Sequence, residues 1–306
     1  MIEIISAGML STVQDLGRFK VMKNGFTQSG VMDAYSTKIA NKLCKNDVNA
    51  PVIEMTMLGI TAKFKGKHIF AISGGIFDIS LNGNPIRTNK AYVAKDGDVL
   101  SIKGAKQGLR CYLAVAGGFD VPLFMGSAST NLKINVGGFN GRKLKAGDIL
   151  KIGKADKIKN IEKRELPENI YNNPVRVRVV LGPQDDMFCE NDLMLFSKQQ
   201  YTVTSDLDRM GIRLWGIALR GKEKLEIISD AITFGSIQIT NSGMPIILMA
   251  DHQTTGGYAK IATVISADLP KLAQVKPNDK ISFEIIDIDT AEKAAIKQKK
   301  FIDKLF

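Results

Sequence analysis

Residues 175–181 read V-R-V-R-V-V-L, and the alternation of apolar and charged side chains that opens this stretch is typical of a half-buried β-strand. Similar short β-branched or aromatic runs recur between Gly, Asn and Asp turns: H-I-F-A-I-S at 68–73, F-D-I-S-L at 77–81, Y-L-A-V at 112–115 and K-I-S-F-E-I-I-D-I-D at 280–289. Helical periodicity is rare by comparison. The sequence therefore predicts a mainly β chain, a β-rich α+β fold with few helices.

A short motif that recurs along the chain suggests that this pattern of turns and strands occurs in two separate units. The chain reads D-G-D-V-L at 96–100, A-G-D-I-L at 146–150 and N-D-K-I at 278–281. In each copy a turn built from Gly or Asn with Asp leads into an apolar strand, as a hairpin requires. A length of 306 residues suits two domains of ordinary size, so we expect two similar β-rich units.

Two segments have helical character. Asp33 can cap a helix that continues to Asn46, with Ile39, Ala40 and Leu43 on one face. The second is the C-terminal segment 289–306, where Asp289 and Glu292 have the spacing of a capping box. Its apolar side would consist of Ala291, Ala295, Ile302 and Leu305.

The net charge of +11 is concentrated in two segments. Residues 151–164 hold six basic and two acidic side chains, and residues 291–306 hold five basic and two acidic ones. Of the 42 basic residues 32 are Lys, whereas nucleic-acid readers favour Arg for bidentate contacts. We interpret the charge as solvated surface and expect no nucleic-acid partner.

Other counts exclude further classes of protein. Cys44, Cys111 and Cys189 lie far apart, which argues against a disulfide framework and for a reducing compartment. With only two histidines, His68 and His252, no metal site is expected. The N-terminus does not resemble a signal peptide, and no apolar run reaches 18 residues. We expect a soluble, cytoplasmic protein with no membrane partner.

The densest chemistry lies at 251–260, D-H-Q-T-T-G-G-Y-A-K, directly after the strand-like run P-I-I-L-M-A. Gly256 and Gly257 allow a backbone with positive φ, in which successive N–H groups converge on an anion as a nest. Further donors would come from Gln253, Thr254, Thr255, Tyr258 and Lys260. Asp251 would be the proton acceptor. An ordinary hairpin turn is the alternative.

Two further clusters are rich in polar residues. In S-D-L-D-R-M-G-I-R-L-W-G at 205–216, Arg209 and Arg213 could recognise an anion, but an internal Asp–Arg clamp is the favoured interpretation. The other cluster combines T-V-Q-D-L-G-R at 12–18 with S-G-V-M-D at 29–33, a shaped loop that contributes Gln14, Asp15, Arg18, Ser29 and Asp33. Asp33 is interpreted as a helix cap rather than a base.

Two patterns look catalytic without meeting the requirements. G-I-A-L-R-G-K-E at 216–223 has the spacing of a phosphate-binding P-loop but ends in Glu where a Ser or Thr binds Mg²⁺. A strand-like sequence follows it, whereas a P-loop precedes a helix. Asp251 and His252 are neighbours, and neighbours in a strand point to opposite faces, so they are not expected to form a dyad.

The motifs taken together resemble a known family. In chain order they are the blocks 12–18 and 29–33, Y-L-A-V-A-G-G-F-D-V-P at 112–122, G-S-A-S-T at 126–130, G-P-Q at 182–184, D-R-M-G-I-R-L at 208–214, G-S-I-Q at 235–238 and D-H-Q-T-T-G-G-Y at 251–258. This series resembles the biotin-dependent carboxyltransferase family with allophanate hydrolase subunit 2 homology, and within it the group of the KipA proteins, also known as the C subunits of 5-oxoprolinase (PxpC).

The resemblance implies a fold and a domain organisation. Members of the family are built from β-barrel units of cyclophilin-like fold. We therefore expect a first barrel-type domain at 1–160, a Lys-rich linker at 161–174, a second cyclophilin-like barrel at 175–288 and a terminal helix at 289–306. Gln238, within the G-S-I-Q block, is counted with the substrate-binding residues. The expected catalytic residues are Asp251, which would handle a proton, and Arg209 and Arg213, which would balance charge.

The function implied by the resemblance is one part of an ATP-dependent 5-oxoprolinase, which opens 5-oxoproline to L-glutamate. Such a chain works with a KipI-like protein, the B subunit, together with a LamB/YcsF-like protein, the A subunit. It uses ATP with Mg²⁺ at the level of the complex and is inactive alone. Two alternatives remain: carboxyl transfer from carboxybiotin to a urea-like amine, and a KipA-type regulator that antagonises a KipI-like kinase inhibitor.

Some positions depart from the family pattern. Ile60 follows Gly59 where Pro is usual, T-N-S at 240–242 replaces a Pro-containing turn, and Asp230 stands where Glu is common. These changes touch turns near the expected site, so they bear on the substrate more than on the family. The chain also lacks the A-M-K-M biotinylation motif, so it is not a biotin carrier.

Overall fold

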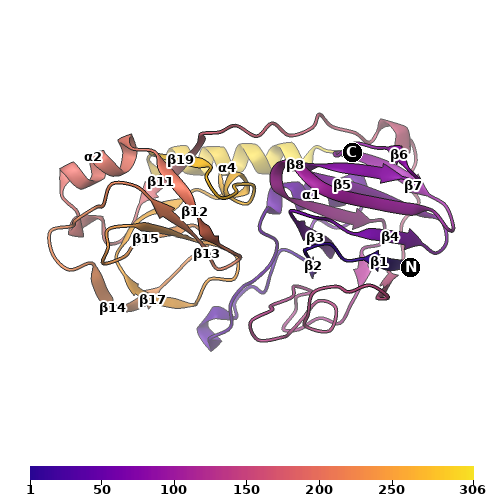
Figure 1. The fold of residues 1–306 in the computed structure, drawn as a ribbon, viewed down its shortest axis with the longest axis horizontal. Helices are drawn as coiled ribbons and strands as arrows, with labels where there is room; N and C mark the ends of the chain where they lie inside the picture. Colours follow the sequence, from indigo (N-terminus) through magenta and orange to yellow (C-terminus); the bar gives the residue numbers. More distant parts are fainter. The chain divides into compact units, whose positions relative to one another are not determined.

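The computed structural model describes residues 1–306, which form two compact units (Figure 1). The first unit consists of Met1–Arg18, Ser29–Ile170 and Ile302–Phe306. The second consists of Phe19–Gln28 and Tyr171–Phe301. Residues 161–170, which the sequence predicts as linker, thus belong to the first unit: the Arg164 side chain donates to the carbonyls of Lys42 and Leu43.

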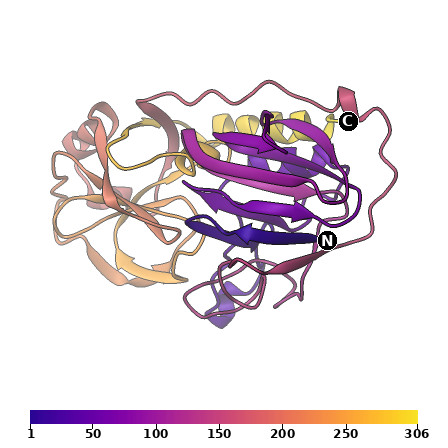
Figure 2. The same ribbon diagram turned by 45° about the vertical axis from the view of Figure 1, so that its right-hand side comes forward.

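The first unit is built on a ten-stranded sheet. Figure 2 shows this sheet in indigo to magenta. Its main path runs β2-β3-β8-β4-β1-β10-β9, and β5 pairs with β8, β6 and β7. Its strands are β1 (Ile2–Ser6), β2 (Leu10–Gln14), β3 (Val52–Thr56), β4 (Thr61–Phe64), β5 (His68–Leu81), β6 (Asn84–Pro85), β7 (Lys90–Ala94), β8 (Val99–Val115), β9 (Phe119–Asp120) and β10 (Ile149–Ile152). Short 3₁₀ turns of the chain lie at η1 (Met22–Asn24), η2 (Ile161–Lys163) and η3 (Asp185–Met187).

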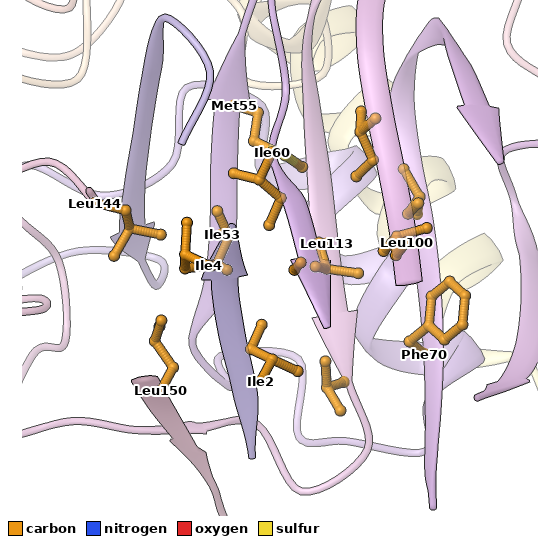
Figure 3. Close-up of a cluster of buried hydrophobic side chains, with 14 of the residues drawn as sticks. Ile2, Ile4, Ile53, Met55, Ile60, Phe70, Leu100, Leu113, Leu144 and Leu150 are labelled. Carbon is orange, nitrogen blue, oxygen red and sulfur yellow. The ribbon is translucent and has the colours of Figure 1, made fainter. Parts of the chain in front are cut away.

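One face of this sheet carries the larger core. Alternate residues of neighbouring strands point to the same side, so Ile2, Ile4, Ile53, Phe70 and Leu113 meet there (Figure 3). None of these side chains is exposed to solvent. Removing that apolar area from water is the main term that stabilises the unit.

The only α-helix that lies wholly in the first unit, α1 (Ala34–Leu43), packs against β5 and β8. Asp33 caps it, as the sequence predicts, by accepting from the Ser36 N–H at 2.8 Å and the Ser36 hydroxyl at 2.6 Å. Ile39, Ala40 and Leu43 form its buried face, also as predicted. The helix ends three residues before Asn46.

The second unit is a closed barrel with the strand order β11-β18-β15-β16-β13-β12-β19. Its strands are β11 (Val175–Leu181), β12 (Tyr201–Leu207), β13 (Gly211–Trp215), β15 (Ser236–Ile239), β16 (Pro245–Leu248), β18 (Lys260–Val264) and β19 (Lys280–Ile285). Ile212, Ile247, Ile237 and Ala262 lie in one row of the pairing register and are all buried inside the barrel. The expectation of a mainly β fold with few helices is confirmed.

A separate two-stranded sheet completes the second unit: β14 (Glu226–Ala231) pairs with β17 (Thr255–Tyr258). The remaining helices are α2 (Glu190–Lys198), α3 (Leu269–Leu272) and α4 (Ile288–Asp303). The predicted tail helix begins one residue earlier than expected. Its first turn is capped by Asp287, which accepts from the Thr290 N–H at 2.7 Å, so the expected Asp289–Glu292 capping box was wrong. None of the helices is long and apolar enough to span a bilayer.

Candidate functional site

Arg209 and Asp251 form a buried ion pair that joins two of the sequence motifs. The Arg209 Nε and Nη2 donate to the two Asp251 carboxylate oxygens at 2.8 and 3.2 Å, and the Asp251 N–H donates to the Arg209 carbonyl at 2.7 Å. Their side chains are only 7% and 12% exposed. The predicted clamp therefore exists, but its acid is Asp251 rather than an Asp of the same loop. With both oxygens engaged, Asp251 holds the turn in place and is poorly placed to accept a substrate proton.

Arg213 does not take part in this clamp. It lies on β13 between Ile212 and Leu214, which both point into the barrel, so its side chain points outward and is exposed. It makes no ion pair within the chain. The two arginines of the motif thus have different roles: one is structural and the other is a cation on the surface.

Lys260 is also used internally. Its Nζ donates to the Asp230 carboxylate at 2.5 Å and to the Ala231 carbonyl at 2.8 Å, and the side chain is 4% exposed. The Lys260 N–H donates to the Gln184 side chain at 3.2 Å. Lys260 therefore ties β14 to the barrel, and the expectation that its charge is available to an anion is wrong in this structure. The hydrogen bond from Lys260, together with that from the Ala231 N–H, holds the pKa of Asp230 below its usual range.

Gly256 and Gly257 do not form the predicted anion nest. Neither has a positive φ; both lie in β17 as extended residues. Their absent side chains serve close packing instead. A Cβ on Gly256 would lie 2.8 Å from the Gln238 Nε2. Gln238, whose Nε2 donates to the Tyr258 carbonyl at 3.2 Å, is buried beneath this strand.

The donors that remain for a ligand are Thr254 and Thr255. Their hydroxyls make no hydrogen bond within the chain, and both residues are accessible to solvent. Gln253 is exposed, and Tyr258 is half-buried. The arrangement can therefore present two hydroxyls and an amide on a turn that the Arg209–Asp251 pair holds from one side and the Lys260–Asp230 pair from the other.

His252 lies inside this turn but does not face its neighbour Asp251 as a partner. It is 1% exposed, and its Nδ1 is 2.6 Å from the Gln253 carbonyl, an arrangement in which Nδ1–H donates. Burial lowers the pKa of His252 below the ordinary histidine value, although the Gln253 hydrogen bond and Asp251 oppose this. No hydrogen bond joins His252 to Asp251, in line with the expectation that they form no dyad.

His252 predicts a loss of stability in acid. In the unfolded chain the His252 imidazole takes up a proton at about pH 6.5, whereas in the folded chain it does so only at lower pH. Stability therefore falls as the pH drops from about 7.5 through the unfolded pKa and stops falling below the folded one. Urea unfolding between about pH 5.5 and 7.5 measures this slope. The His252→Asn variant, which keeps a donor near the Nδ1 position, is expected to have a shallower slope.

The control for this experiment is His68, the chain's other histidine. Burial lowers its pKa too, so it contributes in the same direction. A His68→Asn variant isolates its share, and the double variant is expected to remove the histidine part of the slope. An unchanged slope in His252→Asn would show that the turn does not keep this imidazole neutral.

The 12–18 and 29–33 motifs build a second polar cluster, in the first unit. Asp15 is 2% exposed and accepts four hydrogen bonds: from the Gly17 N–H at 2.9 Å, the Ser127 hydroxyl at 2.6 Å, the Ser129 hydroxyl at 2.5 Å and the Ala128 N–H at 2.7 Å. The G-S-A-S-T motif is thereby wrapped around one carboxylate. This shared acceptor explains why two motifs more than 100 residues apart lie together.

The neighbouring predicted residues are engaged in the same cluster. Gln14 Nε2 donates to the Thr12 hydroxyl and the Thr130 carbonyl, both at 3.0 Å, and its Oε1 is buried with no partner. Arg18 Nε donates to the Phe124 carbonyl at 3.2 Å, and the guanidinium lies over the Phe124 ring. Ser29 accepts from the Asn131 side chain at 3.1 Å. Gln14, Arg18 and Ser29 are all buried, so they shape the loops rather than line an open surface.

Sequence reasoning missed several buried polar residues of the first unit. Glu54 accepts from the Met32 N–H at 2.7 Å, and the Tyr112 hydroxyl accepts from the Asp33 N–H at 2.9 Å. Glu54 and Tyr112 are opposite each other in the β3–β8 pairing. Burial, with the nearby carboxylates, raises the pKa of Tyr112. The sequence signal that could have revealed this pair is Glu54 itself, a charged residue within the strand V-I-E-M-T.

Most of the sequence motifs described above lie within a single known protein family domain. The family model "Carboxyltransferase domain, subdomain A and B" matches residues 24–285, which is most of the chain. The chain belongs to the carboxyltransferase domain family. The blocks that match include both polar clusters of the second unit and the G-S-A-S-T loop of the first.

Two bacterial proteins are similar to this carboxyltransferase domain over nearly their whole length. The chain is 38% identical to the 5-oxoprolinase C subunit of Escherichia coli over 305 residues, covering 100% of this chain and 97% of the relative. It is equally 38% identical to the 5-oxoprolinase C subunit of Haemophilus influenzae over 307 residues, with the same coverage.

Carboxyltransferase domains in longer proteins are also similar. The crystal structure of Kluyveromyces lactis urea amidolyase superposes with a TM-score of 0.92 at 30% identity, and this chain covers 20% of that one. The structure TTHA0988 superposes with a TM-score of 0.84 at 32% identity over 92% of this chain and 55% of the other. In both, the domain is one part of a larger polypeptide.

The carboxyltransferase domain offers no P-loop for a nucleotide. Residues 216–223, which have the spacing, form a loop that leads into the strand β14 and not into a helix. A P-loop needs a helix N-terminus behind its glycines to stabilise the phosphates. The Lys260 ammonium, the cation of the 251–260 motif, is already paired with Asp230. These residues do not fit ATP, so we assign no step through a nucleotide to them.

Proposed function

We propose that this chain is the C subunit of an ATP-dependent 5-oxoprolinase, which adds water across the lactam C–N bond of 5-oxoproline to give L-glutamate. The observation that carries the proposal is the 38% identity to two 5-oxoprolinase C subunits over essentially the whole of each chain. A relationship that spans both units includes every motif described above, not only one shared domain.

The 251–260 turn is the part of the chain that we assign to the substrate. 5-Oxoproline carries a carboxylate, a lactam N–H and a carbonyl oxygen. Thr254 and Thr255 offer hydroxyl donors that nothing else in the chain uses, and Gln253 adds an amide. The Arg209–Asp251 pair positions this turn, and Arg213 is an exposed cation of the same unit. Donors fixed before the substrate binds lose little conformational freedom on binding.

The proposal includes partners. Residues 216–223 and Lys260 do not fit a nucleotide, so we assign ATP with Mg²⁺ to the complex of this chain with two others. They are a KipI-like protein, which we call the B subunit, and a LamB/YcsF-like protein, which we call the A subunit. We expect the complex to be cytoplasmic and the isolated chain to be inactive.

Reconstitution tests the proposal. The three purified proteins should form glutamate from 5-oxoproline and ATP, and omission of any one should abolish the reaction. Replacing Thr254 and Thr255 together by Val removes both hydroxyls and keeps strand-compatible shapes. We expect kcat/KM to fall at least about tenfold, the effect of one or two lost hydrogen bonds.

Thr263→Val is the matched control for this double variant. Thr263 lies on β18 of the same barrel, and its hydroxyl has no hydrogen bond either, but it is not part of the 251–260 turn. Its kcat/KM should equal that of the unaltered complex. A double variant that is as active as the control would remove Thr254 and Thr255 from the site, whereas complete inactivity of the three unaltered proteins would contradict the function itself.

One observation favours a second function, carboxyl transfer from carboxybiotin to a urea-like amine. It is the TM-score of 0.92 with urea amidolyase, whose name describes chemistry on urea. Under this alternative the Thr254 and Thr255 hydroxyls would hold the oxygen of the ureido ring. The reaction would depend on a separate biotinylated carrier and would stop when avidin is added; turnover that is insensitive to avidin excludes it.

A further inference from the structure

An exposed apolar pair lies at the end of β13: Trp215 is the last residue of the strand, and Ile217 follows it by two positions. Trp215 is 67% exposed and Ile217 64%. Ile212 and Leu214 point into the barrel, so Arg213 and Trp215 point outward together. We call Arg213, Trp215 and Ile217 the Trp215 face. Trp and Arg are the residues most enriched at the centres of protein interfaces.

The segment that carries this face is held rigidly. Gln199 uses both atoms of its amide on the Ile217 backbone: Oε1 accepts from the N–H at 2.8 Å and Nε2 donates to the carbonyl at 3.1 Å. The same Nε2 donates to the Tyr201 hydroxyl at 2.8 Å, and Tyr201 is fully buried in the core. Gly216 packs so closely that a Cβ would lie 2.7 Å from the Gln199 Oε1. Exposed apolar side chains on a preorganised backbone lose little entropy when they bind.

The charges around this face restrict what can cover it. Lys280 Nζ donates at 2.7 Å to the hydroxyl of Thr202, which is opposite Trp215 in the β12–β13 pairing, and Lys198 directly precedes Gln199. Arg213, which points outward on the same strand as Trp215, adds a third cation. A second copy of this chain would bring the same cations face to face, which is unfavourable. The occupant should be a different protein, with an apolar pocket rimmed by Asp and Glu.

We propose that the Trp215 face is the docking surface for such an acidic-rimmed partner, and that within the function proposed above this partner is the KipI-like B subunit. This inference rests on that proposed function for the identity of the partner. The similar domains in urea amidolyase and TTHA0988 are parts of longer chains, so in those proteins other domains are joined to this one covalently. The two 5-oxoprolinase C subunits are covered to 97% by this chain, so those relatives hold no such additional domains and need a non-covalent surface to reach other subunits.

Trp215 is the chain's only tryptophan, which makes a direct test possible. 5-Fluorotryptophan incorporated into this chain gives one ¹⁹F resonance, which the tryptophans of an unlabelled KipI-like partner do not obscure. Adding that partner should shift the resonance and remove its sensitivity to exchange of H₂O for D₂O. The unaltered chain is used, so the result does not depend on any variant folding correctly.

Variants supply the energetic test. Ile217→Asp should weaken the binding of the KipI-like partner at least about thirtyfold, as expected for a residue at the centre of an interface. Leu123→Asp, the same change at a residue of the first unit that is 65% exposed, should change the affinity less than about twofold. Equal effects of the two substitutions would overturn the inference.

The outcomes separate this inference from the proposed function. A complex that forms and turns over 5-oxoproline while Trp215 stays sensitive to D₂O overturns the docking surface alone. Absence of both complex and turnover overturns the function and the surface together. A resonance that shifts with the concentration of this chain alone, with a dimer seen by sedimentation, would show a second copy as the occupant and contradict the proposal.

Discussion

Replacing Asp15 by Ala is expected to lower the free energy of unfolding by at least about 4 kcal/mol, because it leaves four donors without an acceptor and each buried unpaired group costs about 1–3 kcal/mol. The carboxylate accepts four hydrogen bonds in a site that is 2% exposed. Urea unfolding followed by circular dichroism measures the change, which would rank among the largest single-residue effects.

Ser127→Ala and Ser129→Ala are the controls for Asp15. Each removes one donor and leaves the carboxylate with three, so we expect losses of about 1–2 kcal/mol. If Asp15→Ala destabilises the protein no more than these serine variants, water must replace the carboxylate as the acceptor. The Asp15 carboxylate would then not be what holds the 12–18 and 126–130 motifs together. Asp15→Asn is a further check because the amide turns one acceptor atom into a donor that faces N–H and O–H groups.

Arg209→Met is expected to destabilise the second unit by about 3–5 kcal/mol, because it leaves the Asp251 carboxylate buried without its counter-charge. The reason is the geometry of the pair: two parallel hydrogen bonds at 2.8 and 3.2 Å between side chains that are nearly inaccessible to solvent. Arg209→Lys should also be destabilising, since an ammonium cannot reproduce the paired donors of a guanidinium.

A double-mutant cycle completes the test of this pair. Combining Arg209→Met with Asp251→Asn removes both charges, and we expect it to restore most of the lost stability. Arg213→Met is the control. Arg213 lies on the exposed face of β13, so its replacement should change the free energy of unfolding by less than about 0.5 kcal/mol. A cycle with no coupling between Arg209 and Asp251 would mean that the pair is not formed in solution.

Features governed by local chemistry were predictable from the sequence. The Asp33 cap, the face of α1 and the strand at 175–181 each depend on residues within a few positions of one another. The internal Asp–Arg clamp was predicted as a type of contact, because Arg is scarce in this chain and its motif is rich in Asp. Its partner Asp251 was not, since 42 residues separate the two in the chain.

Features governed by tertiary contacts were not predictable. Asp15 meets Ser127 and Ser129 from across the first unit, and no local pattern encodes that distance. The nest at 256–257 was wrong for a related reason. Glycine permits a positive φ but does not require it, and here the space above Gln238 requires an extended residue without a Cβ. Lys260 was expected to face a ligand, but it pairs with Asp230. The residues next to Lys260 in the sequence do not indicate this partner, which lies 30 positions away.

The way the two units are divided along the chain has a consequence for any attempt to cut the protein. Residues 19–28 are sequence from the N-terminal half that belongs to the second unit, and residues 302–306 are sequence from the C-terminus that belongs to the first. The polypeptide therefore passes from one unit to the other four times. A gene fragment that encodes one continuous piece must therefore either omit part of a unit or include most of the other unit, so the smallest segment that can be copied with both units intact is the whole pair.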